Sequence, residues 1–387
     1  MSAITDYLRT VRKIHRGQSA TEHSYRAALA ELLEAVGSGV VATNEPKHRS
    51  DCGAPDMSVT DGPGPEALKI GYIECKDIGV PLDETAKNEQ LTRYRENLPN
   101  LILTDYLEFR WYVEGEERMR ASLAHASGTQ TRSPGAPAWT AVPEGEESLA
   151  DLLTSFLART PEPITSPEEL ARRMARITRM IRDIIIIEFN TGDQAGATWG
   201  LFEAFKETLL PKIKPGEFAD MFAQTLAYGL FAARVNHPAG GPFTRRNAPW
   251  EIPKTNPFLR KLFGSITGPD LDGEPYVGFV DDLTRVLAHA DIGAVLADFG
   301  ASTRQEDPIV HFYETFLAAY DPKLREMRGG RLTESEPKSF VPNPQLRPTF
   351  VLRNHLSACL KGENFIYSTV HKRPLIDDCF HITALKQ

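Results

Sequence analysis

The sequence predicts an α/β domain followed by an all-helical domain, and three features of the chain carry this prediction. Short apolar runs rich in β-branched and aromatic residues, which are typical of strands, lie among helical segments in residues 1–125. The next stretch, 126–147, is rich in Gly, Pro, Ser and Thr and marks a linker. Residues 148–328 then show the apolar spacing of helices. The last segment, 329–387, has no sustained pattern and is treated as an atypical tail.

The first domain follows the order strand, strand, helix, strand, which is an α/β pattern. A turn rich in Gly and Pro at 61–65 separates the first two strands, so we expect them to pair as a hairpin. A helix at 21–36 precedes this hairpin, and a further strand is expected after Gly115. The other expected strands are 57–60, 68–76, 100–105 and 107–113.

The end of the second strand carries the residues with the most chemical information. Side chains alternate along a strand, so Glu74 and Lys76 point to one side while Cys75 points to the other. Asp56 stands at the start of the first strand, and the hairpin brings it close to Glu74. Magnesium is a hard cation that usually takes one or two carboxylates from protein and keeps several waters. We therefore expect Asp56, Glu74 and the backbone carbonyl of Cys75 to bind Mg²⁺.

Phosphodiester hydrolysis is the chemistry that this arrangement favours. The reaction requires a water made nucleophilic near neutral pH and positive charge beside the phosphoryl oxygens. The metal would meet the first need, and Lys76 would orient the attacking water or stabilise the developing charge. We therefore predict that Asp56, Glu74 and Lys76 are the catalytic residues of a nuclease.

The pair Pro55-Asp56 followed by Glu74-Cys75-Lys76 resembles the motif of the PD-(D/E)xK nuclease superfamily. This resemblance implies a restriction-endonuclease-like α/β fold, in which the acidic residues bind metal and the lysine assists hydrolysis. Gln90 and Tyr94, four residues apart, resemble the Q-x-x-x-Y helix of several branches, where both residues help to position the substrate. Glu22 matches the upstream glutamate that some of these families add to the site.

Each of these residues also has a purely structural interpretation. An aspartate after a proline is common in turns, and Glu74 with Lys76 would suit the solvated face of an edge strand. Gln90 and Tyr94 would fit ordinary packing on a helix surface. Glu22 would stabilise the first turn of its helix through its charge. Both interpretations stay open at the level of the sequence.

The second domain contains five expected helices, one of which carries three arginines on one face. Arg172, Arg176 and Arg179 follow at spacings of four and three, so they form a stripe. Such a stripe would suit DNA phosphates, although arginines also solvate the outer face of an amphipathic helix. The expected helices are 171–187, 201–209, 218–235, 279–290 and 309–320.

A second basic cluster lies in the loop at 244–250. Arg245 and Arg246 stand near Trp250, which makes the loop a further candidate for contact with nucleic acid. Packing of Trp250 into the helical core is the stronger expectation. The whole chain has a net charge of -8 at pH 7, so any binding of DNA must depend on such local clusters.

Three stretches of the helical domain resemble the helical spacer of single-chain restriction–modification enzymes of the Type IIG and Type ISP kind. They are Arg182-Asp183 with the isoleucines that follow, FAQTLAYGLFAAR at 222–234, and DPIVHFYETFL at 307–317 with YDPK at 320–323. In those enzymes an N-terminal PD-(D/E)xK nuclease, the spacer, an adenine-N6 methyltransferase and a target-recognition domain follow one another. The resemblance covers residues 1 to about 328, and it implies a DNA endonuclease module of a restriction–modification system.

The residues after 328 depart from that family. The chain has no glycine-rich loop after a strand to hold S-adenosylmethionine, and no N-P-P-Y or D-P-P-Y segment to hold a flipped adenine. We therefore expect Mg²⁺ as the cofactor, no methyltransferase activity, and a truncated or rearranged gene product. A separate methyltransferase or recognition subunit would direct the module on double-stranded DNA, and two copies would have to meet to cut both strands. The alternative is a non-catalytic remnant that binds DNA or a methyltransferase.

The composition favours a cytoplasmic protein. The chain has 387 residues, of which 41% are hydrophobic and 25% charged, and its four cysteines are scattered without the spacing of a zinc site or disulfide framework. Its apolar runs are too short to cross a bilayer, so we expect no contact with membranes.

Overall fold

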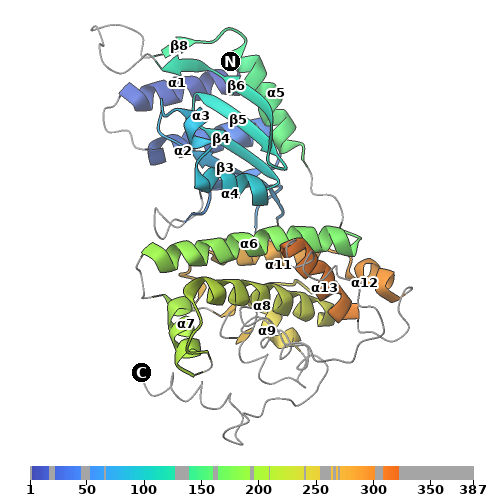
Figure 1. Cartoon of the computed structure of the whole chain (residues 1–387). Coiled ribbons are helices and arrows are strands. Elements are labelled where there is room, and N and C mark those ends of the chain that lie inside the picture. The colour runs from blue at the N-terminus through green and yellow to red at the C-terminus, as the bar shows by residue number, and fades with distance from the viewer. Residues whose placement is uncertain are drawn as a thin grey trace, which may run out of the picture. The chain divides into compact units, whose positions relative to one another are not determined.

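The protein consists of two compact units, which Figure 1 shows in a computed structural model. The first unit contains the described residues up to 159, and the second contains those from 164 onward. The structure describes residues 2–16, 22–44, 53–64, 67–126, 139–159, 164–191, 196–208, 210–238, 241–252, 263–264, 267–268, 271–300 and 308–321. The predicted tail, 329–387, lies outside these residues.

Unit 1 is built on a mixed six-stranded sheet whose spatial order follows the chain. The strands are β1 (Val41–Asn44), β2 (Met57–Thr60), β3 (Lys69–Cys75), β4 (Asn100–Thr104), β5 (Glu108–Val113) and β6 (Glu116–Ser122). The predicted hairpin is confirmed, since β2 and β3 pair antiparallel with Met57 opposite Ile73. Strands β3 and β4 are parallel, whereas the other neighbours are antiparallel. A parallel pair needs a crossover, and α3 (Leu82–Thr85) and α4 (Glu89–Asn97) lie within it.

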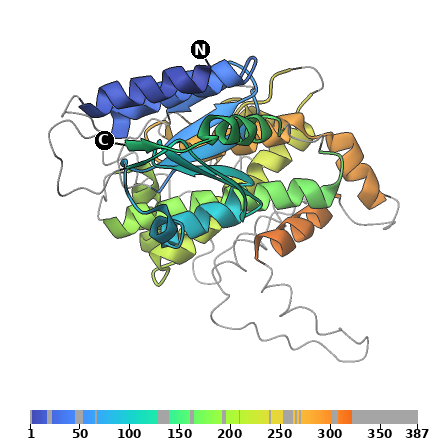
Figure 2. The ribbon, with the colours of Figure 1, turned by 90° about the horizontal axis from the view of Figure 1, so that it is seen from above.

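The two faces of the sheet are covered by different helices. The helices α1 (Ala3–Arg16), α2 (Glu22–Val36) and α5 (Gly145–Leu157) contribute to one hydrophobic core with alternate strand residues such as Ile73 and Ile102. The opposite face meets α4, where Arg95 lies 5.0 Å from the centre of the Tyr112 ring of β5. Figure 2 shows α1 and α2 on one side of the sheet and α4 on the other. Because side chains alternate along β3, Glu74 points to the α4 face.

The boundary of unit 1 lies later than the sequence predicts. Helix α5 belongs to unit 1 because Leu149, Leu152, Leu153 and Phe156 are fully buried in its core. The Asn100 side-chain amide also donates to the Phe156 carbonyl oxygen at 3.0 Å. The expected linker 126–147 therefore includes ordered structure, namely β8 (Trp139–Ala141), paired with β7 (Ala124–Ala126), and the first turn of α5. The first domain extends past residue 125 and includes the beginning of the segment assigned to the helical part.

Helices are the regular elements of unit 2 within its described residues, apart from one isolated bridge between Ile164 and Ala290. Its longest helix, α6, contacts α8, α11 and α13, and α8 is buried along most of its length. A helix that is apolar on every side belongs in a core, so α8 forms the centre of the bundle. The five predicted helices are confirmed, whereas α9 and α12 were not expected. The helices are α6 (Pro167–Thr191), α7 (Ala197–Thr208), α8 (Pro215–Asn236), α9 (Ala248–Glu251), α11 (Val277–His289), α12 (Ile292–Gly300) and α13 (Pro308–Tyr320).

Candidate active site

Asp56 lies at the entrance of β2 with its carboxylate against the end of β3. Its Oδ2 accepts a hydrogen bond from the backbone N–H of Cys75 at 2.7 Å, and its side chain is 2% exposed. The bonded peptide is the one that joins Glu74 to Cys75. The hairpin thus brings Asp56 to the position beside Glu74 that the sequence predicts.

Glu74 and Lys76 emerge together, as expected from the alternation of side chains. The Lys76 ammonium donates to Glu74 Oε1 at 2.6 Å, and the lysine side chain is 23% exposed while that of Glu74 is 3% exposed. The pairing of β3 with β4 continues past Cys75, because the Lys76 N–H donates to the Thr104 carbonyl oxygen at 2.8 Å. The strand end is therefore fixed, and the lysine alone of this pair reaches toward solvent.

Tyr94 of α4 lies close enough to Glu74 and Asp56 to feel their charges, and Gln90 of the same helix bonds to it. The Gln90 amide donates to the Tyr94 hydroxyl oxygen at 3.0 Å. Burial raises the pKa of Tyr94 well above its usual value, and the negative charges of Glu74 and Asp56 add to the rise. At neutral pH the phenol is therefore a neutral hydrogen-bond donor beside two carboxylates.

Arg26 is a member of this cluster that the sequence did not disclose. Its Nη2 lies 2.7 Å from Asp56 Oδ1, and the two side chains are 3% and 2% exposed. A signal for it existed, because Arg26 falls on the apolar stripe of α2, three and seven residues before the buried Leu29 and Leu33. A charged residue on a buried stripe implies a buried partner. Glu22 opens the same helix, but its side chain lies outside the described part of the chain.

The Cys75 side chain points away from the carboxylates into the core on the other face of the sheet. Burial raises the pKa of the Cys75 thiol well above its usual value, with a further rise from Asp56. The thiol is therefore protonated and unsuited to bind a metal or act as a nucleophile. What Cys75 offers the site is its backbone, and its N–H already holds Asp56.

The donor set fits magnesium rather than a softer metal. Asp56 and Glu74 carry hard oxygen atoms, the ligand type that magnesium prefers. Within the described residues, no group of three or more His, Cys, Asp and Glu side chains is placed to hold a metal. Magnesium accepts a site with only one or two carboxylates because water fills its remaining positions. Two acids, Asp56 and Glu74, are balanced by two bases, Arg26 and Lys76.

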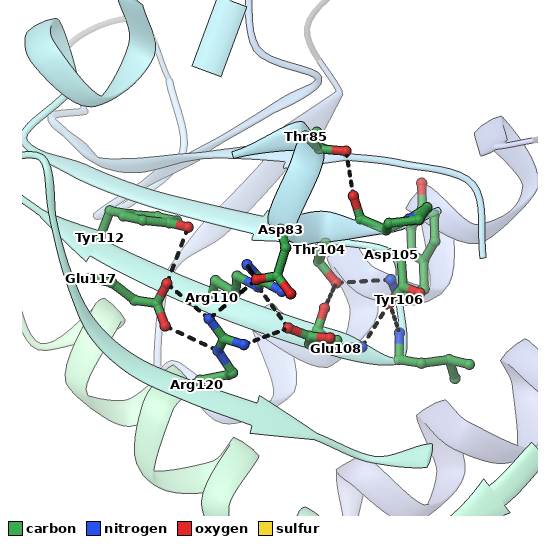
Figure 3. Close-up of polar contacts among 12 residues, drawn as sticks. Asp83, Thr85, Thr104, Asp105, Tyr106, Glu108, Arg110, Tyr112, Glu117 and Arg120 are labelled. Carbon is green, nitrogen blue, oxygen red and sulfur yellow. Dashed lines mark hydrogen bonds and ion pairs between the residues drawn. The ribbon is translucent and has the colours of Figure 1, made fainter. Parts of the chain in front are cut away.

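A second charged cluster lies on the same face of the sheet, two strands away. The strand register aligns Glu74 with Leu103, Leu103 with Arg110, and Arg110 with Arg120, and such opposite residues share a face. Figure 3 shows this network around Arg110. Its contacts are Arg110 with Asp83 (2.7 Å) and Glu108 (2.6 Å), Arg120 with Glu117 (3.0 Å), and Tyr112 with Glu117 (3.3 Å).

The charges of this second network act on one another. Hydrogen bonding to Arg110 lowers the pKa of Asp83. Burial opposes the charge of Arg110, but Glu108 and Asp83 outweigh it and raise the arginine's pKa. The network contains three acids and two arginines, so its net negative charge makes it unsuited to bind phosphate. Its role is structural, because the bond between Arg110 and Asp83 fastens α3 to the sheet.

The turn after β4 is tied by hydrogen bonds to the segment that follows β3. Asp105, also drawn in Figure 3, accepts hydrogen bonds from the backbone N–H groups of Gly79 (3.0 Å), Leu107 (3.1 Å) and Glu108 (2.7 Å). Burial raises the pKa of Asp105, and these three bonds oppose that rise. Asp105 thereby fastens the segment that follows Lys76.

The predicted arginine stripe of α6 does not act as one surface. Arg179 donates to the carbonyl oxygens of Ala319 (3.0 Å) and Tyr320 (3.1 Å), the last residues of α13. Arg172 forms an ion pair with Glu169 one turn earlier. The expectation that Arg172, Arg176 and Arg179 contact DNA together is therefore corrected for Arg179. Its guanidinium group binds the C-terminus of α13, where a cation stabilises the exposed carbonyl groups.

The loop at 244–250 also differs from its prediction. Arg245 is buried and holds the loop together through Asp272 (2.6 Å), Asp281 (2.9 Å) and the Thr267 carbonyl oxygen (3.1 Å), so it is not available to nucleic acid. Arg246 is 72% exposed and pairs with Asp272 at 2.9 Å. The expectation that Trp250 packs into the helical core is wrong, since its side chain is 72% exposed.

Comparisons with known proteins include a distant structural likeness. No protein family matches the chain, and no curated protein matches it. Among solved structures, the chain is similar to one in the cryo-EM structure of a DrdV–DNA complex, with 20% sequence identity and a TM-score of 0.31. The match covers 84% of this chain and 29% of that chain, so the present chain spans less than a third of that protein's length. No helix in the described residues has the length and apolar character needed to cross a bilayer.

Proposed function

We propose that unit 1 is a magnesium-dependent DNA endonuclease module of a restriction–modification system. One observation carries the proposal: the Asp56 carboxylate is bonded to the peptide that follows Glu74, and Lys76 is bonded to Glu74. Two buried acids and a partly exposed ammonium group, gathered where β2 begins and β3 ends, are groups that metal-assisted phosphodiester hydrolysis uses. The fold assignment that belongs with this proposal is restriction-endonuclease-like.

Asp56, Glu74 and the Cys75 carbonyl oxygen would hold the magnesium ion, which supplies a Lewis acid and a more acidic bound water. Lys76 is the only one of the four charged residues with appreciable exposure, so its ammonium group would orient the water or stabilise charge on the phosphate. The neutral Tyr94 phenol, held by Gln90, would donate a hydrogen bond at the site. Gln90 and Tyr94 both lie on α4, so the helix limits how far their side chains move.

The substrate in this proposal is double-stranded DNA. One active centre cuts one strand, so a double-strand break would need two copies on the duplex. Selection of a site requires side chains that read base edges in a groove, and a separate methyltransferase or recognition subunit would supply them. Methyltransferase activity is not proposed for this chain.

Nicking of supercoiled plasmid in the presence of MgCl₂ tests the proposal. Asp56→Asn and Lys76→Met should each reduce nicking at least about 100-fold, the usual effect of removing one electrostatic group from an active site. Glu116→Gln and Lys87→Met are matched controls, because both residues are exposed charged positions of unit 1. Circular dichroism would confirm that all four variants fold. Equal nicking by the parent and both site variants would contradict the proposal.

A non-catalytic DNA- or methyltransferase-binding module is the second candidate, and the Arg26–Asp56 ion pair favours it. A guanidinium group already neutralises one of the two acids at 2.7 Å, as expected in a site that no longer binds metal. Retention of plasmid in a gel-shift assay without nicking at any MgCl₂ concentration would support this candidate.

A further inference from the structure

Asp56 is held from two directions by groups of unit 1. Its Oδ2 accepts the Cys75 N–H and its Oδ1 accepts the Arg26 guanidinium, both at 2.7 Å. These two bonds hold both oxygen atoms of the carboxylate. The carboxylate is therefore fixed in place before any metal arrives.

Arg26 reaches this carboxylate from a buried position. The side chains of Arg26 and Asp56 are almost fully buried, and Tyr25, Ala28 and Leu29 of α2 are buried beside the arginine. In such surroundings water screens charge only weakly. The positive charge of Arg26 thus acts on anything that binds Asp56 Oδ1.

A divalent cation at Asp56 would experience this charge directly. Arg26 stabilises the ionised carboxylate and its geometry, but it repels a second cation at the same oxygen. The same electrostatic effect should weaken the binding of Mg²⁺.

We propose that Arg26 is a positioning residue that holds Asp56 ready in the metal-free site and competes with the divalent cation for that carboxylate. This inference rests on the proposed metal site. In this role Arg26 sets the concentration of Mg²⁺ at which the site is filled. Removal of the arginine charge should lower that concentration, and it should also destabilise the metal-free protein.

Thermal unfolding of the full chain in EDTA and in a series of MgCl₂ concentrations, at constant ionic strength, tests the inference without any activity measurement. Arg26→Gln is the main variant, because it keeps a polar side chain at this position but carries no charge. We expect a lower Tm than the parent in EDTA. We also expect a larger rise in Tm with MgCl₂, with a midpoint at least about tenfold lower in concentration.

The double variant Arg26→Gln/Asp56→Asn is the matched control. It removes both charges of the pair, so its Tm should show no such response to MgCl₂. If Arg26→Gln does not fold in EDTA, refolding on addition of MgCl₂ would support the inference, and failure to refold at any MgCl₂ concentration while the double variant folds would overturn it. Equal MgCl₂ midpoints in the parent and Arg26→Gln would also overturn it.

The plasmid assay separates this inference from the proposed function. Nicking by the parent together with equal midpoints would leave the nuclease proposal standing and remove the role of Arg26. The opposite result, no nicking but an Asp56-dependent shift in Arg26→Gln, would support the competition and contradict catalysis. No MgCl₂ response in any variant would overturn the metal site and this inference together.

Discussion

Glu74 of the candidate site lies on the same face of the sheet as the Arg110 network, and both clusters contain the same kinds of charged residue, but they differ in burial. In the candidate site, Arg26 and Asp56 are 3% and 2% exposed. In the network, Arg110 is equally buried, yet its partner Asp83 is 72% exposed. Both contacts measure 2.7 Å, so distance alone does not distinguish them.

The difference shows how burial changes the consequence of breaking a pair. If one partner is removed from a buried pair, the other charge is left without compensation in a region of low dielectric constant. An exposed partner can instead recover its hydration, which is why exposed pairs contribute little. The candidate site therefore depends on its pairing more strongly than the network does.

The largest expected effect is on stability after truncation of Asp56. Asp56→Ala should lower the free energy of unfolding by about 3–5 kcal/mol, because Arg26 would be left buried without its partner. The measurement is urea-induced unfolding at pH 7 in the absence of metal. The double variant Arg26→Met/Asp56→Ala should recover most of the loss, and a loss below about 1 kcal/mol for the single variant would contradict the comparison.

A smaller loss is expected when the central arginine of the network is removed. Arg110→Met should lower the free energy of unfolding by about 1–2 kcal/mol, because Glu108 loses a charged hydrogen bond but can be rehydrated. The same urea experiment measures it. A loss as large as that of Asp56→Ala would show that burial of both partners is not what separates the two clusters.

The two clusters should also differ in catalysis. Tyr94→Phe removes a hydroxyl that lies near Glu74 and Asp56, and it should slow plasmid nicking about tenfold, the value of one modest hydrogen bond. Tyr112→Phe removes the hydroxyl that donates to Glu117 in the network, so it serves as the matched control with unchanged nicking. Similar rates for both variants would remove Tyr94 from the site.

The smallest expected effect is a change in pH dependence at the exposed end of the network. Arg110 lowers the pKa of Asp83 in the folded protein, so the ionised aspartate favours folding above its unfolded pKa of about 3.9. The difference in unfolding free energy between the parent and Asp83→Asn should stay constant above about pH 5 and disappear as the pH falls through the lowered folded pKa. Urea unfolding across this range measures it, with Glu84→Gln as a control on the same helix. A difference independent of pH would contradict the ion pair.

Most of the first unit's sheet follows from local sequence patterns. The alternation around β3 predicts which side Glu74 and Lys76 share, and the Gly- and Pro-rich turn predicts that β2 pairs with β3. The position of Asp56 follows from these two facts. The alternation of side chains along a strand and the residue preferences of a turn depend only on neighbouring residues, so both can be predicted from the sequence.

Other assignments depend on partners far away in the chain. Arg179 and Arg245 look like surface arginines in sequence, but one caps α13 from 140 residues away and the other holds Asp272 and Asp281. Trp250 shows the opposite error, since a large apolar side chain predicted to be buried is exposed. Local composition does not report which long-range partner a side chain meets.

The sequence by itself predicted the central strands of the sheet, the helix at 21–36 and five helices of unit 2, and it singled out two acids and a lysine as candidates, because these patterns depend on residues close together along the chain. Only the tertiary structure decided that α5 completes the first core and that Arg26 neutralises Asp56. The Arg26–Asp56 bond joins residues 30 positions apart, and the Asn100–Phe156 bond that ties α5 to the sheet joins residues 56 positions apart. Such contacts depend on how whole elements pack, and the energetic cost of a buried charge then selects the partner it must have.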